Sequence, residues 1–105
     1  MSARFFGDLC DEVDIPTNGT LSRVVHSDDA VRLVLFGFDG GQELTEHTAA
    51  LPVIIQVLTG TVTISLTEVS HRMRPGAWLQ LDAHEPHSVV ADEPARIALT
   101  MIRSG

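Results

Sequence analysis

The stretch Gly40–Gly60, GGQELTEHTAALPVIIQVLTG, decides the fold of this chain. Two glycines open it, and a polar segment then leads to its only histidine, His47. Pro52 interrupts the pattern, and because proline cannot donate to a strand ladder, the chain is expected to bend there. An apolar run follows and stops at Gly60. The stretch therefore predicts a polar strand, a bend, a buried strand and a tight turn, with one imidazole at the bend.

The segments on either side of this stretch also carry strand patterns. In residues 61–67, Val62, Ile64 and Leu66 alternate with hydroxyl side chains, which predicts a half-buried antiparallel strand. Residues 31–38, VRLVLFGF, predict a strand buried on much of both faces. Further strands are expected at residues 21–26, 42–47, 53–58, 71–73, 77–81, 87–91 and 95–102.

Short strands separated by glycine, proline and acidic turns are typical of a β-sandwich or small barrel. Beyond residue 15 no segment supports a helix of useful length, so a parallel sheet with crossover helices is excluded. The sequence thus predicts an all-β domain of antiparallel strands. Near the N-terminus, Phe6, Leu9 and Val13 have helix-like spacing, which predicts either a helical turn or an arm that lies against a partner.

Length and charge limit the remaining possibilities. With 105 residues the chain is expected to form one domain, residues 1–105, divided into an N-terminal arm (1–20) and a β-barrel (21–105). The formal net charge is −7, and the seven basic residues are scattered arginines, so nucleic-acid and anionic membrane partners are disfavoured. Cys10 is the only cysteine, and no apolar run approaches the roughly 18 residues of a membrane span. A cytoplasmic location is therefore expected.

Two spacings then connect the chain to a known family. In the first, Gly41, His47, Ala49, Val53 and Gly60 are separated by five, one, three and six residues. In the second, five, one and two residues separate a glycine, an aspartate and two histidines: Gly76, Asp82, His84 and His87. Together with the phrases LPVIIQVLTG, RPGAW and DAHEPH, they resemble the two motifs of the cupin superfamily. The resemblance covers about residues 31–102 and implies a small, single-domain, RmlC-like jelly roll, a double-stranded β-helix of antiparallel strands.

In metal-binding cupins the motifs supply three histidines and one glutamate, which hold a divalent metal such as iron, manganese, nickel or zinc. The resemblance implies His47 and His87 as metal ligands here, whereas Ala49 and Val53 occupy the other two ligand positions. His84, three residues before His87, is a further candidate ligand. Thr45 and the flanking Glu43 and Glu46 are candidate substitutes, Thr45 because even spacing places it on the strand face of His47.

Three functional hypotheses follow from the intact fold motifs and the reduced ligand set. The first is a protein that binds a small molecule in a barrel pocket around His47, Ala49, Val53 and His87, with no certain cofactor. The alternative is a metal-dependent enzyme of the dioxygenase, isomerase or decarboxylase type, so whether the chain is an enzyme stays open. The third is a structural module, and in all three cases the resemblance implies a homodimer.

Overall fold

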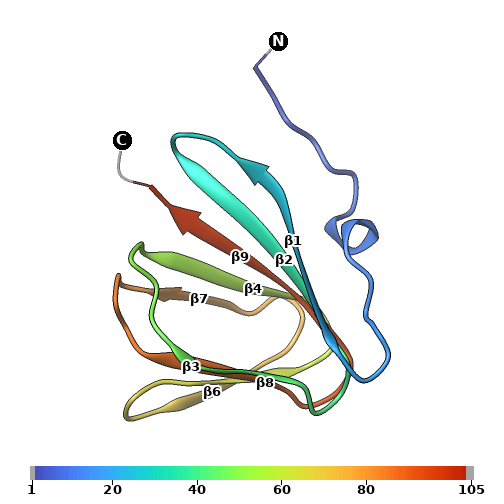
Figure 1. Ribbon diagram of the computed structural model, residues 1–105, viewed down its shortest axis with the longest axis vertical. Coiled ribbons are helices and arrows are strands. Elements are labelled where there is room, and N and C mark those ends of the chain that lie inside the picture. Colours follow the sequence, from blue (N-terminus) through green and yellow to red (C-terminus); the bar gives the residue numbers. More distant parts are fainter. Residues whose placement is uncertain (1, 104–105) are drawn as a thin grey trace.

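Two antiparallel sheets lie face to face in the computed structural model, which describes residues 2–103 (Figure 1). A 3-10 turn, η1 (Leu9–Glu12), precedes the strands. The strands are β1 (Thr20–Ser27), β2 (Val31–Phe38), β3 (Glu43–His47), β4 (Val53–Thr59), β5 (Val62–Ser65), β6 (Ser70–Met73), β7 (Trp78–Leu81), β8 (His87–Ala91) and β9 (Ala95–Ile102). The predicted domain also includes residues 1, 104 and 105, which lie outside the described part.

The order of the strands is that of a jelly roll. One sheet runs β1-β2-β9-β4-β7 and the other β3-β8-β5-β6, and every pairing is antiparallel. β9, near the end of the chain, pairs with both β2 and β4 and so sits at the centre of the larger sheet. The all-β jelly-roll prediction is therefore confirmed, with each expected strand present within a few residues of its predicted ends.

The main core lies between the inner faces of the two sheets. Ile55 and Ile97 project from the larger sheet and Ile64 and Val89 from the smaller, and each is at most 1% exposed. β4 follows the expected alternation: Ile55 and Val57 face inward and are buried, whereas Gln56 between them faces outward and is exposed. Transfer of these side chains out of water supplies the main driving force, about 1.5–3 kcal/mol for each fully buried aliphatic side chain.

A second, smaller cluster explains why β2 is apolar on both faces. Phe38 points into the main core, whereas Leu35 points to the outer face and packs with Val13 of the N-terminal segment. The guanidinium Nε of Arg96 donates to the carbonyl of Val13 at 2.8 Å and holds the segment in place. Of the two N-terminal alternatives, the helical turn is the one seen: η1 is a single turn capped by the Asp8 carboxylate.

Glycines stand where the chain passes closest to itself. Gly60, which ends the apolar run of β4, has a positive φ of 74°, and a Cβ there would overlap the carbonyl oxygen of Pro94. Gly37 lies on the outer face of β2, where a Cβ would overlap the carbonyl oxygen of Asp14. The first glycine permits the β4–β5 turn, and the second lets the N-terminal segment lie flat on the sheet.

Within residues 2–103 no helix is long and apolar enough to span a membrane. The cytoplasmic location inferred from the cysteine content stays a prediction.

Replacing Gly37 by alanine is expected to lower the free energy of unfolding by about 1–3 kcal/mol, because the N-terminal segment must move away from the sheet. Urea denaturation measures this loss. Gly40→Ala is the matched control, since its Cβ would meet Pro94 at an ordinary contact distance of 3.5 Å. Equal destabilisation by the two substitutions would contradict the close packing of Asp14 on β2.

Candidate functional site

The four pocket positions expected from the sequence lie around one cavity of about 360 Å³. His47 and His87 come from the smaller sheet, Val53 begins β4, and Ala49 lies in the loop between β3 and β4. Figure 1 shows the end of β3, the start of β8 and the end of β9 on one side of the barrel, and residues of all three strands line the cavity. The rest of its wall consists of Phe36, Thr48, Ala50, Leu51, Leu99 and Met101.

His47 and His87 are directly opposed on neighbouring strands, with ring centroids 4.3 Å apart and ring planes tilted by 56°. The opposition depends on an irregularity in β3, where three steps from Leu44 to His47 match two steps on β8. In a regular ladder Glu46 would stand opposite His87, so the extra residue exchanges a carboxylate for an imidazole at this position. His87 is only 2% exposed, whereas His47 is exposed at the cavity mouth.

Each of the two rings is fixed by a hydrogen bond of the same type, to the carbonyl oxygen two residues earlier in the chain. Nδ1 of His47 lies 2.8 Å from the carbonyl oxygen of Thr45, and Nδ1 of His87 lies 2.8 Å from the carbonyl oxygen of Glu85. A carbonyl oxygen only accepts, so each Nδ1 carries the hydrogen and donates it. Nε2 is then the ring nitrogen left for a ligand on both side chains. It accepts when the ring is neutral and donates when the ring is protonated.

The donor set does not fit a resident metal centre of the four-ligand cupin type. Ala49 and Val53 line the cavity but have no donor atom in their side chains. Among residues 2–103 there is no group of three or more histidine, cysteine, aspartate or glutamate side chains placed to hold a metal ion. Two imidazoles would leave most of the coordination shell to water or to a bound molecule.

None of the candidate substitute ligands is part of the cavity wall. The expectation that Thr45 shares the face of His47 assumed a regular strand, and the irregularity between Leu44 and His47 removes that regularity. Glu43 and Glu46 are exposed on β3. His84 is exposed in the β7–β8 loop, has a positive φ of 68°, and donates its backbone N–H to the Ala49 carbonyl at 2.7 Å.

Sequence reasoning missed the apolar wall of the cavity. Phe36 and Met101, which no motif singles out, both line the cavity together with Leu99. Their common feature is that they project from the inner face of two neighbouring strands, β2 and β9. Alternation along each strand predicts which residues face inward, but only the pairing of β2 with β9 shows which of them reach the histidines.

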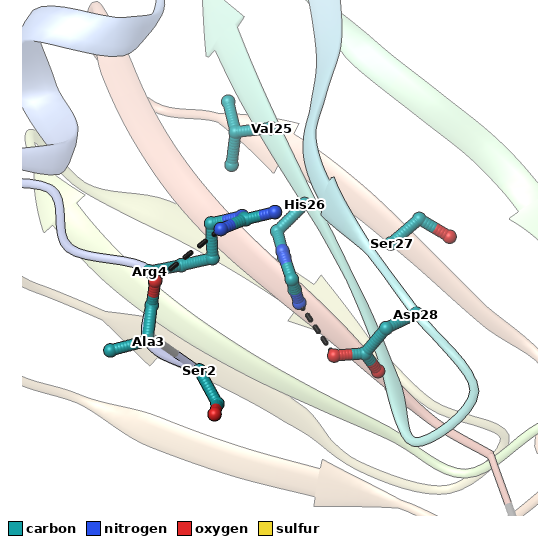
Figure 2. A pocket seen from close by; sticks show the side chains of 7 residues that line it. All are labelled: Ser2, Ala3, Arg4, Val25, His26, Ser27 and Asp28. Carbon is teal, nitrogen blue, oxygen red and sulfur yellow. Dashed lines mark hydrogen bonds and ion pairs between the residues drawn. The ribbon is translucent and has the colours of Figure 1, made fainter.

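A larger hollow of about 570 Å³ lies elsewhere, between the N-terminal segment and the end of β1 (Figure 2). In its wall, Nε2 of the His26 ring lies 2.7 Å from the Asp28 carboxylate. The backbone N–H of Val31, followed by His26 and the N–H of Ala30, lowers the pKa of Asp28 to about 2. On the other wall, Nη1 of Arg4 donates to the neighbouring Ala3 carbonyl at 3.4 Å. These bonds stabilise the β1–β2 turn and leave no inward-facing group comparable to the histidine pair.

Cys10 and Trp78 also lie away from the cavity. Burial raises the pKa of the Cys10 thiol, and the nearby Asp8 carboxylate raises it further, so the reactive thiolate is disfavoured. Trp78 is 59% exposed on β7. Its indole therefore neither fills the core nor shapes the mouth of the cavity.

No protein-family model matches the chain, and no curated protein sequence matches it. Solved structures do. A cupin superfamily protein from Desulfitobacterium hafniense is 20% identical with a TM-score of 0.85, covering 91% of this chain and 88% of its own. An RmlC-like cupin from Desulfovibrio desulfuricans is 23% identical with a TM-score of 0.81, covering 97% and 96%. KdgF from Halomonas sp. is 27% identical with a TM-score of 0.75, covering 90% and 92%.

These similarities concern the fold. They extend over nearly the whole of each chain. The chain therefore has the fold of a small cupin domain, as the sequence motifs indicated.

Introducing the two missing donors, Ala49→His with Val53→Glu, is expected to create a metal site with His47 and His87. Without metal the variant should be less stable than wild type, because Val53 is 1% exposed and a buried carboxylate is costly. Nickel or manganese at one hundred times its Kd should then raise the free energy of unfolding by about 2.7 kcal/mol. Thermal denaturation with and without metal measures both changes.

The matched control adds His47→Ala to the same pair of substitutions and should lose the response to metal. A response that survives this third change would show that the four side chains do not act on one ion.

Proposed function

We propose that this cupin domain binds a small, largely apolar molecule in the cavity between its sheets, with His47 and His87 as the polar anchors. The observation that carries this proposal is the cavity wall, which is apolar except for the two imidazoles and Thr48. Its volume of about 360 Å³ lies at the small end of the range of protein ligand sites. Burial of apolar ligand surface would supply the affinity, and the imidazoles would select the orientation.

The histidine pair gives the site its chemical selectivity. Each ring is held by its Nδ1–H bond, so both Nε2 atoms are available without reorganisation of the side chains. A hydroxyl group of a ligand can donate to Nε2 of a neutral ring, whereas a carbonyl group can bond only to a protonated ring, whose Nε2 donates. The function proposed is binding, for sensing or sequestering the molecule, without bond chemistry.

A metal-dependent enzyme is the second candidate, and the opposed imidazoles with free Nε2 atoms are the observation that favours it. Such a site would depend on water and substrate for its remaining ligands. Elemental analysis of protein purified without a nickel column separates the candidates. Stoichiometric metal that is lost on replacing His47 by alanine would support the enzyme and contradict the metal-free binding site.

Screening a panel of small metabolites by thermal shift is expected to find compounds that stabilise the wild-type chain. A ligand at one hundred times its Kd should raise the free energy of unfolding by about 2.7 kcal/mol. His47→Ala should weaken such a ligand by roughly tenfold through loss of one hydrogen bond. His71→Ala is the matched control, because His71 is exposed on β6 and does not line the cavity. A panel without any stabilising compound, or equal weakening by both substitutions, would contradict the site.

We also propose that two copies of the chain associate through the N-terminal segment and β1. β1 is an edge strand of the larger sheet, and Leu21 on it is 43% exposed. Phe5 in the preceding segment is 88% exposed, a large apolar side chain that a second copy would cover. Figure 1 shows this segment extending along the outside of the barrel, where an approaching copy could reach it.

Light scattering at micromolar concentration is expected to give the mass of two chains. Replacing Phe5 and Leu21 by serine should shift the mass toward one chain, because the apolar contact is lost. Val69→Ser is the control, since Val69 is 49% exposed between β5 and β6, away from β1. A monomeric wild type would rule out the dimer.

A further inference from the structure

An arginine stands beside the cavity on the same wall as its apolar lining. In the register of the larger sheet, Arg32 of β2 is directly opposite Met101 of β9, which lines the cavity. Directly opposed residues of antiparallel strands project to the same face. Arg32 also shares the inner face of β2 with Phe36, four residues further along the strand, and Phe36 lines the cavity too. Arg32 therefore lies on the inner face at the open end of the barrel.

The guanidinium of Arg32 has no partner among the described residues. Its Nε is buried and forms no hydrogen bond, although the side chain as a whole is only partly buried. Neither Arg32 nor Arg103 forms an ion pair with any carboxylate within residues 2–103. A buried donor of a charged group that lacks an acceptor is costly, and such groups are commonly completed by a ligand.

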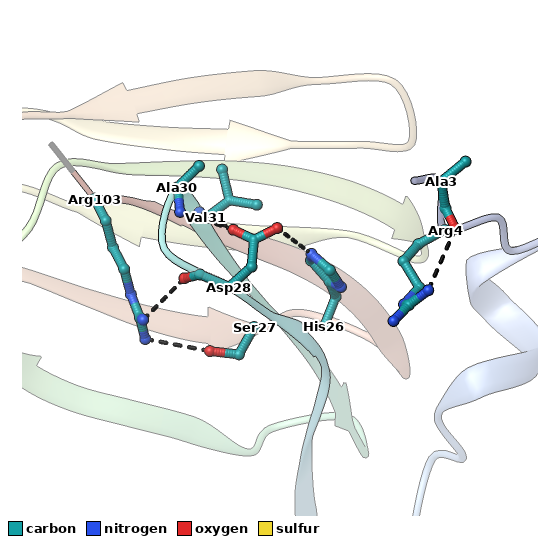
Figure 3. A network of polar contacts seen from close by, with 8 residues as sticks. All are labelled: Ala3, Arg4, His26, Ser27, Asp28, Ala30, Val31 and Arg103. Carbon is teal, nitrogen blue, oxygen red and sulfur yellow. Dashed lines mark hydrogen bonds and ion pairs between the residues drawn. The ribbon is translucent and has the colours of Figure 1, made fainter. Parts of the chain in front are cut away.

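A second arginine increases the positive charge at this position. Arg103 donates through its two terminal nitrogens to the carbonyl oxygen of Asp28, at 2.9 Å, and to the hydroxyl of Ser27, at 3.2 Å (Figure 3). Ser27 is the residue directly opposite Arg32 on β1, so the serine that Arg103 contacts is the strand neighbour of Arg32. The Asp28 carboxylate forms no ion pair with either arginine, since it accepts from His26 and from the N–H groups of Ala30 and Val31, but its negative charge offsets part of their positive charge.

The charge at the rim contrasts with the rest of the molecule. The chain has a formal net charge of −7, yet no aspartate or glutamate lines the cavity. Neither arginine is part of the cavity wall, but Arg32 is next to Met101 in that wall, and its positive charge attracts an anion toward the uncharged pocket. Because both terminal nitrogens of Arg103 already donate within the chain, Arg32 supplies the one planar fork that remains. One such fork matches the two oxygens of a carboxylate.

We propose that the cavity takes a small carboxylic acid, with its apolar body between the sheets and its carboxylate on Arg32. Arg103 holds the β1–β2 turn and adds positive charge without direct contact to the ligand. This inference rests on the proposed binding function and names the chemical class of its ligand. A phosphate ester has three terminal oxygens to satisfy, and a single fork would leave part of that group without donors.

Isothermal titration calorimetry with phenylacetate and its neutral analogue phenylacetamide tests the inference. Wild type should bind the acid at least about tenfold more tightly than the amide, as expected for a charge-assisted hydrogen bond. Arg32→Gln should remove this preference, because it weakens binding of the acid at least about tenfold more than binding of the amide. Arg32→Lys, which keeps the charge but not the fork, should retain part of the preference. Thermal denaturation of each variant checks that the barrel is folded.

Arg74→Gln is the matched control, because it removes the same charge from an exposed residue outside the cavity. It should leave the preference for the acid intact. Equal binding of acid and amide to wild type would overturn the inference while the binding function stands. If neither phenylacetate nor phenylacetamide binds and the metabolite panel also finds no ligand, both the carboxylate inference and the proposed binding function are rejected. Tighter binding of phenyl phosphate than of phenylacetate would overturn the carboxylate class, and equal losses in Arg32→Gln and Arg74→Gln would overturn the role of Arg32.

Discussion

Burial of one apolar face of each sheet against the other is the constraint on which the whole barrel depends. Ile55, Ile64 and Ile97 are fully buried between the sheets and can be so only if each strand keeps its period-two alternation. β9 connects this core because it pairs with β2 on one side and β4 on the other. At the open end the same inner faces diverge around a cavity instead of meeting, so the walls of the site are a continuation of the core.

The outer face of the larger sheet is covered by the chain itself. Val13 packs on Leu35, and its carbonyl accepts a hydrogen bond from Arg96 of β9. Gly37 provides the flat surface that this contact needs. As a result β2 is buried on both faces and holds its inner residues, Phe36 among them, at fixed positions along the cavity wall.

The site combines a preserved framework with a reduced set of donors. His47 and His87 are opposed and held through Nδ1, which is the arrangement that leaves Nε2 to a ligand. Ala49 and Val53 make the neighbouring wall apolar, so the cavity favours burial of a hydrocarbon group over coordination of an ion. This wall is the basis of the small-molecule binding that we propose, and Arg32 beside it is the basis of the proposed preference for a carboxylate.

The sequence by itself determined the strands, the jelly roll and the four positions around the cavity, because hydrophobic alternation, glycine turns and motif spacing are local properties. It could not show the irregularity in β3 that sets His47 instead of Glu46 opposite His87, so the regular alternation assumed for Thr45 does not hold there. Nor could it show that Arg32 stands beside Met101, since the two are brought together only by the pairing of β2 with β9. Register between strands distant in sequence depends on how the whole core packs, and this was decided by the tertiary structure alone.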